Sequence, residues 1–248
     1  MGLRICITAE EFLPFPSGRL RRIYEVAKRL AKDNEVHIYC QKYNETLGAR
    51  VIDGIYVHGI GIPTTSPSFS ARFSYIFPLF LSILKNGRFD IINTNWLLPP
   101  LPSYITAKLK NIPIILTSDG LLWYYVNTLN MHGYSRLQTF FGHIMENLDL
   151  KLDYDAYIAV SKRAKEELVL MGIDSSKVFI VYNGVDLEFY DRLKVQEQDE
   201  PTICYVGHLE ARKGILDLIR AFSIVLKRIP NAKLLIVGSG SLLMRAKE

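Results

Sequence analysis

The feature that most constrains this chain is the alternation of short, apolar segments with longer amphipathic ones. Segments such as 4–9 and 90–95 are apolar at successive positions, as expected of strands that are covered on both faces. Between the first two segments, Leu20, Ile23 and Ala27 recur at helical spacing. Repeated strand–helix units predict an α/β fold with a doubly wound, Rossmann-like parallel sheet. The strands expected in this part are 4–9, 35–40, 56–60, 90–95, 113–119, 156–161 and 178–183.

A second strand–helix–strand unit follows a polar break that ends in proline. Its strands are expected at 202–207 and 232–238, and its helix carries an apolar stripe from Ile215 to Ile229. This unit is shorter than a complete Rossmann-like domain, which needs well over about 100 residues. The expected organisation is an N-terminal domain over 1–193, a linker over 194–201 and a partial C-terminal domain over 202–248.

Composition and charge exclude several classes of protein. With 49% hydrophobic and 22% charged residues, the chain is neither disordered nor collagen-like. The formal charge of +5 predicts an anionic partner, which can be a nucleic acid, a phosphorylated substrate or an anionic membrane surface. Its basic residues are not interleaved with aromatic ones as in nucleic-acid-binding modules, so no nucleic-acid partner is expected.

The apolar segments are too short to span a membrane. The longest, at 75–84, falls well below the roughly 20 residues that a spanning helix needs, and the N-terminus lacks the pattern of a signal peptide. We therefore expect a cytoplasmic protein. For the aromatic segment 69–84 two interpretations stay open, a buried helix and a contact with a lipid-linked acceptor or bilayer.

The three cysteines are too few and too scattered for a disulfide framework or a zinc site. Cys6 and Cys204 lie within apolar strand segments, so both are expected to be buried. No cluster of metal ligands stands out, and no metal ion is expected.

Two segments of the second unit can bind an anion. Gly-Ser-Gly at 238–240 follows a strand, where a glycine turn lets backbone amides approach a phosphate. In the segment 205–214, Lys213 lies beside the start of the helix, and its charge adds to the positive end of the helix dipole. A ligand-free turn and a solvated basic loop are the structural alternatives.

The first domain contains two further candidate segments, and both have the composition of turns. The loop at 14–22 follows the first strand and contains Ser17-Gly18, but it lacks the G-x-G-x-x-G pattern of dinucleotide-binding dehydrogenases. The segment Tyr-Asn-Gly-Val-Asp at 182–186 follows the last strand and has the composition of a turn.

Taken in their order along the chain, these four segments resemble the N-terminal domain and the start of the C-terminal domain of a family 4 glycosyltransferase, which has the GT-B fold. The resemblance extends over essentially the whole chain. It implies retaining transfer of a sugar from a UDP- or GDP-linked nucleotide-diphosphate sugar to a sugar or lipid-linked acceptor. It implies no bound cofactor and no metal ion.

The resemblance also assigns roles to residues. Asp119 stands where the family often has a histidine beside the transferred sugar, and it is the expected catalytic residue. His208 replaces the arginine of the family pattern. The residues expected to bind the donor diphosphate are Gly18, Gly207, His208, Arg212, Lys213, Gly238 and Gly240. Those expected on the acceptor side or lining the cleft are Ser17, Asn95, Trp96, Trp123 and Asn183.

One element of the family pattern is not found in these 248 residues, namely a pair of glutamates eight positions apart that holds the donor sugar and ribose. We therefore expect this chain to be a truncated form of such a glycosyltransferase. A first alternative is a catalytically incompetent module that binds an acceptor or a membrane. A second alternative is a Rossmann-like nucleotide-binding protein unrelated to sugar transfer.

Overall fold

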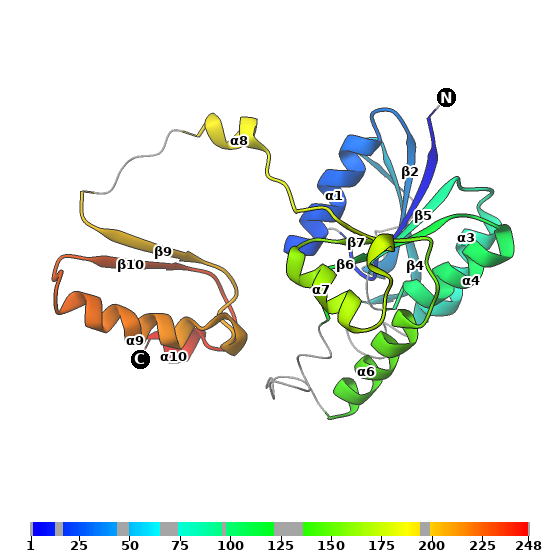
Figure 1. Ribbon diagram of the computed structural model, residues 1–248. Helices are drawn as coiled ribbons and strands as arrows, with labels where there is room; N and C mark the ends of the chain where they lie inside the picture. Colours follow the sequence, from blue (N-terminus) through cyan, green and yellow to red (C-terminus); the bar gives the residue numbers. More distant parts are fainter. Residues whose placement is uncertain are drawn as a thin grey trace. The chain divides into compact units, whose positions relative to one another are not determined.

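The computed structural model describes residues 2–12, 17–43, 50–64, 74–95, 98–121, 136–193 and 199–247. These residues form two compact units, one up to Gly184 and the other from Val185 onward (Figure 1). The polar segment 194–201 led us to expect the first domain to end at residue 193, and that boundary stays a prediction. Most of the expected linker, 194–198, lies outside the described residues.

The first unit is built on an eight-stranded sheet in the order β3-β4-β2-β1-β5-β6-β7-β8. Every neighbouring pair is parallel except β3 with β4, and this confirms the predicted α/β class. Strand β3 was not predicted, although Asp53-Gly54 gives the positive φ angles of a two-residue hairpin turn. The strands are β1 Arg4–Thr8, β2 Glu35–Tyr43, β3 Arg50–Ile52, β4 Ile55–Thr64, β5 Ile91–Asn95, β6 Ile114–Ser118, β7 Ala156–Ala159 and β8 Val178–Ile180.

Serine caps begin two of the helices in this unit. The Ser17 Oγ accepts a hydrogen bond from the amide of Leu20 at 3.3 Å, and the Ser161 Oγ accepts one from Ala164 at 3.1 Å. Both helices therefore start immediately after a strand–loop connection, as an α/β unit requires. The helices are α1 Gly18–Leu30, α3 Ile76–Lys85, α4 Pro100–Lys110, α6 Arg136–Leu150 and α7 Lys162–Leu170.

The two faces of the sheet are covered differently. The face that carries Thr8 is covered by α4, because the Thr8 Oγ1 lies 2.9 Å from the Ser103 Oγ of that helix. On β5, Ile92 belongs to this face and is fully buried, whereas Ile91 on the opposite face is only half-buried. The opposite face packs against α1 through Leu20, Ile23 and Ala27, which form one core with β1, β2 and β4. The central strands of this second face are therefore only partly covered among the described residues.

The second unit consists of two parallel strands, β9 Thr202–Val206 and β10 Lys233–Val237, with helices α8 Leu187–Asp191, α9 Ile215–Leu226 and α10 Leu243–Lys247. Cys204 is exposed, so its expected burial was wrong. Strand residues on both sides of the pleat are exposed, among them Ile203 and Val206, because few described residues cover this small sheet.

The aromatic segment near residue 80 forms α3. Leu79 and Ile83 are fully buried while Phe77 is exposed, so the helix turns one apolar face inward. Within the described ranges, none of the helices has the length and apolar character needed to cross a bilayer.

Candidate functional site at the carboxyl edge of the sheet

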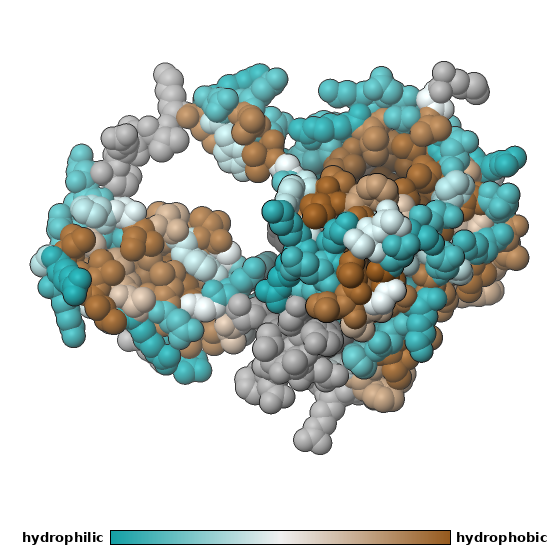
Figure 2. Space-filling view, viewed as in Figure 1, coloured by the Kyte–Doolittle hydropathy of each residue, from teal (hydrophilic) through white to brown (hydrophobic). Residues whose placement is uncertain are grey.

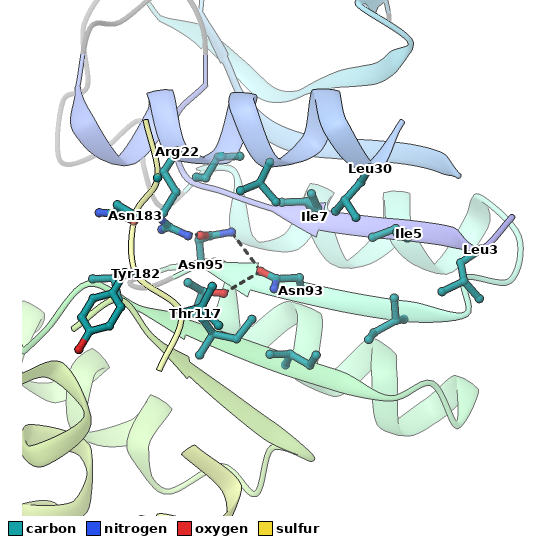
Figure 3. Close-up of a pocket in the computed structure, with 18 residues that line it drawn as sticks. Leu3, Ile5, Ile7, Arg22, Leu30, Asn93, Asn95, Thr117, Tyr182 and Asn183 are labelled. Atoms are coloured by element: carbon teal, nitrogen blue, oxygen red, sulfur yellow. Dashed lines mark hydrogen bonds between the residues drawn. The ribbon is translucent and has the colours of Figure 1, made fainter. Parts of the chain in front are cut away.

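A groove of about 290 Å³ follows the α1 face of the first sheet. Helix α1 forms one wall, and strands β1, β5, β6 and β7 form the floor. Figure 2 shows it as an apolar hollow beside α1. Figure 3 shows that its two ends differ, with Leu3 and Leu30 at the apolar end and Arg22, Asn95 and Asn183 at the polar end. The polar end coincides with the carboxyl ends of the parallel strands, where α/β proteins bind their ligands.

Asn95 is the last residue of β5 and is held firmly at this end. Its Nδ2 donates to the carbonyl oxygen of Thr8 at 3.2 Å, and its Oδ1 accepts from the Arg22 Nη2 at 3.1 Å. Behind it, the Asn93 Oδ1 accepts from the Thr117 Oγ1 at 3.1 Å. The amides on this face are therefore preorganised by neighbouring strands, as a polar binding site requires.

Asp119 follows β6 and accepts from two arginines. Its Oδ2 lies 3.1 Å from the Arg19 Nε and 3.2 Å from the Arg22 Nη2. The next residues are anchored by α7, because the Glu167 Oε2 accepts from the amide of Leu121 at 3.0 Å. The structure thus brings two predicted residues, Asp119 and Asn95, together through Arg22.

Arg22 is the central residue that the sequence analysis did not single out. Its side chain is only 15% exposed, and burial lowers its guanidinium pKa while the charge of Asp119 opposes that shift. A signal was available in the sequence, since Arg19, Arg22 and the buried Ile23 recur at the i, i+3, i+4 spacing of one helix face in the first turns of α1. Residues at that end of a helix point to the carboxyl edge of the sheet.

The other basic residues of α1 are paired on the surface. Arg21 and Arg29 both contact Glu25, and Lys28 contacts Asp53 at 3.7 Å. This pairing favours a solvated, charge-balanced helix face over a free basic surface for a membrane.

The remaining acceptor-side residues are only partly described. Ser17 is exposed and caps α1, and Gly18 is the first residue of that helix. Asn183 is exposed and lines the groove next to Tyr182. Trp96 and Trp123 lie outside the described residues.

In the second unit, the predicted donor-side residues gather at the carboxyl ends of β9 and β10. Gly207 and His208 directly follow β9, while Gly238 directly follows β10. Lys213 is exposed and is the last residue of a short 3-10 turn. Gly214, with a φ of 67°, follows it as the N-cap of α9. For Arg212 the side chain lies outside the described part, so its expected role stays a prediction.

Close packing between the two loops explains why glycine occurs after β10. The amide of Leu209 donates to the carbonyl oxygen of Ser239 at 2.9 Å, and the amide of Leu242 donates to that of Leu209 at 2.9 Å. A Cβ atom at Gly238 would overlap the carbonyl oxygen of Gly207, and one at Gly240 would lie 2.5 Å from that of Leu209. These contacts account for both glycines without a ligand, and their role in phosphate binding stays a prediction.

We expect Gly240→Ala to open this pair of loops, because the atom that its Cβ would meet is backbone and cannot rotate away. Hydrogen exchange at the amides of Leu209 and Leu242 should become at least tenfold faster. Gly184→Ala is the matched control, since nothing lies within 4 Å of a Cβ at that position. Unchanged protection in Gly240→Ala would contradict this account.

Across the described parts of both units, no group of three His, Cys, Asp or Glu side chains is arranged to hold a metal ion. The expectation that the protein works without a metal stays a prediction.

Comparison with protein families identifies the class. A model described as Glycosyltransferase Family 4 matches residues 17–189, and one described as Glycosyl transferases group 1 matches residues 188–248. The first match alone covers more than half of the chain, so the chain belongs to Glycosyltransferase Family 4. This confirms the resemblance inferred from the order of the motifs.

The curated relatives and solved structures agree with this result. Over 185 residues the chain is 38% identical to an uncharacterised glycosyltransferase of Methanocaldococcus jannaschii, covering 65% of this chain and 43% of the relative. Sucrose-phosphate synthase from Thermosynechococcus elongatus aligns with a TM-score of 0.70 at 19% identity, over 94% of this chain and 62% of that one. HepE from Anabaena, in complex with UDP and glucose, aligns with a TM-score of 0.66 at 13% identity, over 96% and 61%. The fold is therefore of the GT-B type. The chain spans less than half the length of the Methanocaldococcus jannaschii relative named above.

Proposed function

We propose that the protein transfers a sugar from a nucleotide-diphosphate sugar to a hydroxyl group of an acceptor, with retention at the anomeric carbon. The observation that carries the proposal is the polar cluster of Asp119, Arg22 and Asn95 at the carboxyl edge of a sheet whose sequence belongs to a glycosyltransferase family. HepE, which shares the fold, was solved with UDP and glucose, and this supports a UDP-linked donor, with GDP as the alternative base.

In the proposed reaction, the bond between the anomeric carbon and the diphosphate oxygen breaks. The acceptor oxygen forms the new bond on the same face of the sugar, and its proton leaves with the nucleoside diphosphate. Catalysis then rests on positioning the two substrates and stabilising the negative charge of the departing diphosphate. No metal ion is part of this proposal.

We assign the donor diphosphate to the second unit. Lys213 is exposed, carries a full positive charge and precedes the amino end of α9, a helix of 12 residues. A cation beside a helix amino terminus stabilises a phosphate through both its charge and the free backbone amides. His208 would add a titratable charge where the family pattern has arginine.

We assign the acceptor to the polar end of the groove in the first unit. The Asn95 and Asn183 amides suit hydroxyl groups of a sugar, since each amide offers both donors and an acceptor. Asp119 can accept a hydrogen bond from a sugar hydroxyl at its Oδ1, because the recorded ion pairs of its carboxylate use Oδ2.

Titration calorimetry of this chain with UDP, UDP-glucose and GDP-glucose tests the proposal. We expect UDP-glucose to bind and Lys213→Ala to weaken it about tenfold, the effect of one lost charge-assisted hydrogen bond. Lys227→Ala is the matched control, because Lys227 lies at the opposite end of α9. Failure of all three nucleotides to bind, or equal affinities for Lys213→Ala and wild type, would refute this assignment of the donor site.

A further inference from the structure

The cluster at the polar end of the groove has unbalanced charge. Two guanidinium groups, those of Arg19 and Arg22, approach the same Oδ2 of a single carboxylate, Asp119. The third group in contact, the amide of Asn95, is neutral. One positive charge therefore has no counter-charge within this set of contacts.

Arg22 also has unused hydrogen-bonding capacity. A guanidinium offers five N–H donors. Arg22 donates to two side chains, Asn95 and Asp119, and it reaches both through its Nη2 atom. Its Nε is buried and has no acceptor among the described residues. A buried donor without an acceptor is costly, and structures retain such a group where a ligand or water completes it.

This capacity lies where a ligand can reach it. Arg22 and Asn95 both line the groove, and Figure 3 shows them beside Asn183 at its polar end. Arg19 is 37% exposed, so it can turn towards an incoming anion. Two guanidinium groups around one point suit the several oxygens of a phosphate better than a neutral hydroxyl.

We propose that Arg19 and Arg22 bind a phosphate group of the acceptor, so that the acceptor substrate is a phosphorylated molecule. This inference rests on the proposed function, because only a transferase has an acceptor substrate. The phosphate site itself can be tested without a donor. The phosphate displaces Asp119 from part of its contact with the arginines, and the amides of Asn95 and Asn183 then contact the adjoining sugar or glycerol hydroxyls.

Phosphate in this position can belong to a free metabolite or to a lipid headgroup. The groove that continues from Arg22 is lined by apolar residues such as Ile5, Ile7 and Val26, so it can also take an acyl chain. Glycerol 3-phosphate and dioctanoyl phosphatidic acid, below its micelle concentration, are the two probes. Binding of either supports the phosphate site, and tighter binding of the lipid identifies a headgroup as the source.

The experiment is titration calorimetry of this chain with both probes and with UDP. We expect Arg22→Gln to weaken phosphate binding at least tenfold, and Arg22→Lys to weaken it less, because lysine keeps the charge without the planar fork. Arg21→Gln is the matched control. Arg21 lies on the same helix, is 72% exposed and pairs with Glu25, so its loss should change affinity less than twofold.

Asp119→Asn gives an independent test, because it removes the carboxylate that competes with the phosphate. We expect it to tighten phosphate binding severalfold and to leave the shape of the site unchanged. The proposal is overturned if neither probe binds, if Arg21→Gln and Arg22→Gln weaken binding equally, or if Asp119→Asn weakens it. If Arg22→Gln lost affinity for UDP as much as for the phosphate probes, the site would belong to the donor diphosphate, and the proposal would also be overturned. Loss of UDP binding in Lys213→Ala alone tests only the assignment of the donor site.

Discussion

Asp149→Asn should stabilise the first unit, by an amount that grows by roughly 2–3 kcal/mol between pH 5 and pH 7. Asp149 lies on α6 with no exposed surface, and neither of its carboxylate oxygens has a hydrogen-bond partner among the described residues. Glu146, three residues earlier, is buried on the same side of the helix. Burial, and secondarily the charge of Glu146, raise the pKa of Asp149 to about 8.

The direction of the effect follows from proton binding. In the unfolded chain Asp149 ionises near its ordinary pKa of 3.8, whereas in the folded chain it keeps its proton up to about pH 8. The folded state therefore binds one more proton across this range, and stability falls as pH rises, by up to about 1.4 kcal/mol per pH unit. Asparagine keeps the shape of the protonated acid and has no proton to lose, so it removes this dependence.

His58 works in the opposite direction and must be separated from Asp149. Burial, with the charges of His37 and Arg4, lowers the pKa of His58 to about 4. The folded state then binds fewer protons than the unfolded state between about pH 4 and 6.5, so this contribution is lost on acidification. The wild-type curve sums both groups, and only the difference between wild type and Asp149→Asn isolates the carboxyl group.

Urea unfolding followed by circular dichroism at pH 5, 6 and 7 measures that difference. Asp153→Asn is the control. Asp153 lies four residues away but is 79% exposed and pairs with Lys177, which lowers its pKa. This control should show no stabilisation that increases with pH. A constant difference between wild type and Asp149→Asn from pH 5 to 7 would show that Asp149 is ionised in the folded state.

The sequence was sufficient for the fold class because its strands are apolar at successive positions. Each strand predicted in the first unit was found, and the helix predicted between the first two strands is α1. Strand β3 was missed because it has only three residues at the sheet edge, with exposed Arg50 and Val51 and no apolar periodicity. Cys204 was wrongly predicted to be buried, because an apolar strand pattern indicates burial, whereas few described residues cover the β9–β10 sheet.

The candidate site was only partly predictable. Asp119 and Asn95 were found through the family resemblance, because they stand where the family often has histidines. The structure places both at the carboxyl ends of neighbouring parallel strands, which share one edge. The role of Arg22 depended on helix orientation, since a basic residue on an amphipathic helix is normally solvated. Burial and the contacts with Asp119 and Asn95 distinguish Arg22 from Arg21, which has the same charge and lies next to it in the chain.

Asp119→Leu should lower the free energy of unfolding by about 2–3 kcal/mol, because removing one partner of a largely buried ion pair leaves the other charge uncompensated. Asp119 is 25% exposed and Arg22 15%, so solvent cannot fully replace the lost carboxylate. The double variant Arg22→Met/Asp119→Leu should recover most of this loss, since an apolar pair of similar volume avoids the cost of desolvation.

Urea unfolding of the two single variants and the double variant closes a double-mutant cycle that measures this coupling. Arg21→Met supplies the comparison on the same helix, and its exposed pair with Glu25 should contribute less than about 1 kcal/mol. If the double variant were no more stable than Asp119→Leu, the carboxylate would not be compensating Arg22. Recovery of stability together with loss of phosphate binding would separate the structural role of Asp119 from the binding role of Arg22, because the apolar pair restores packing but offers no donor to an anion.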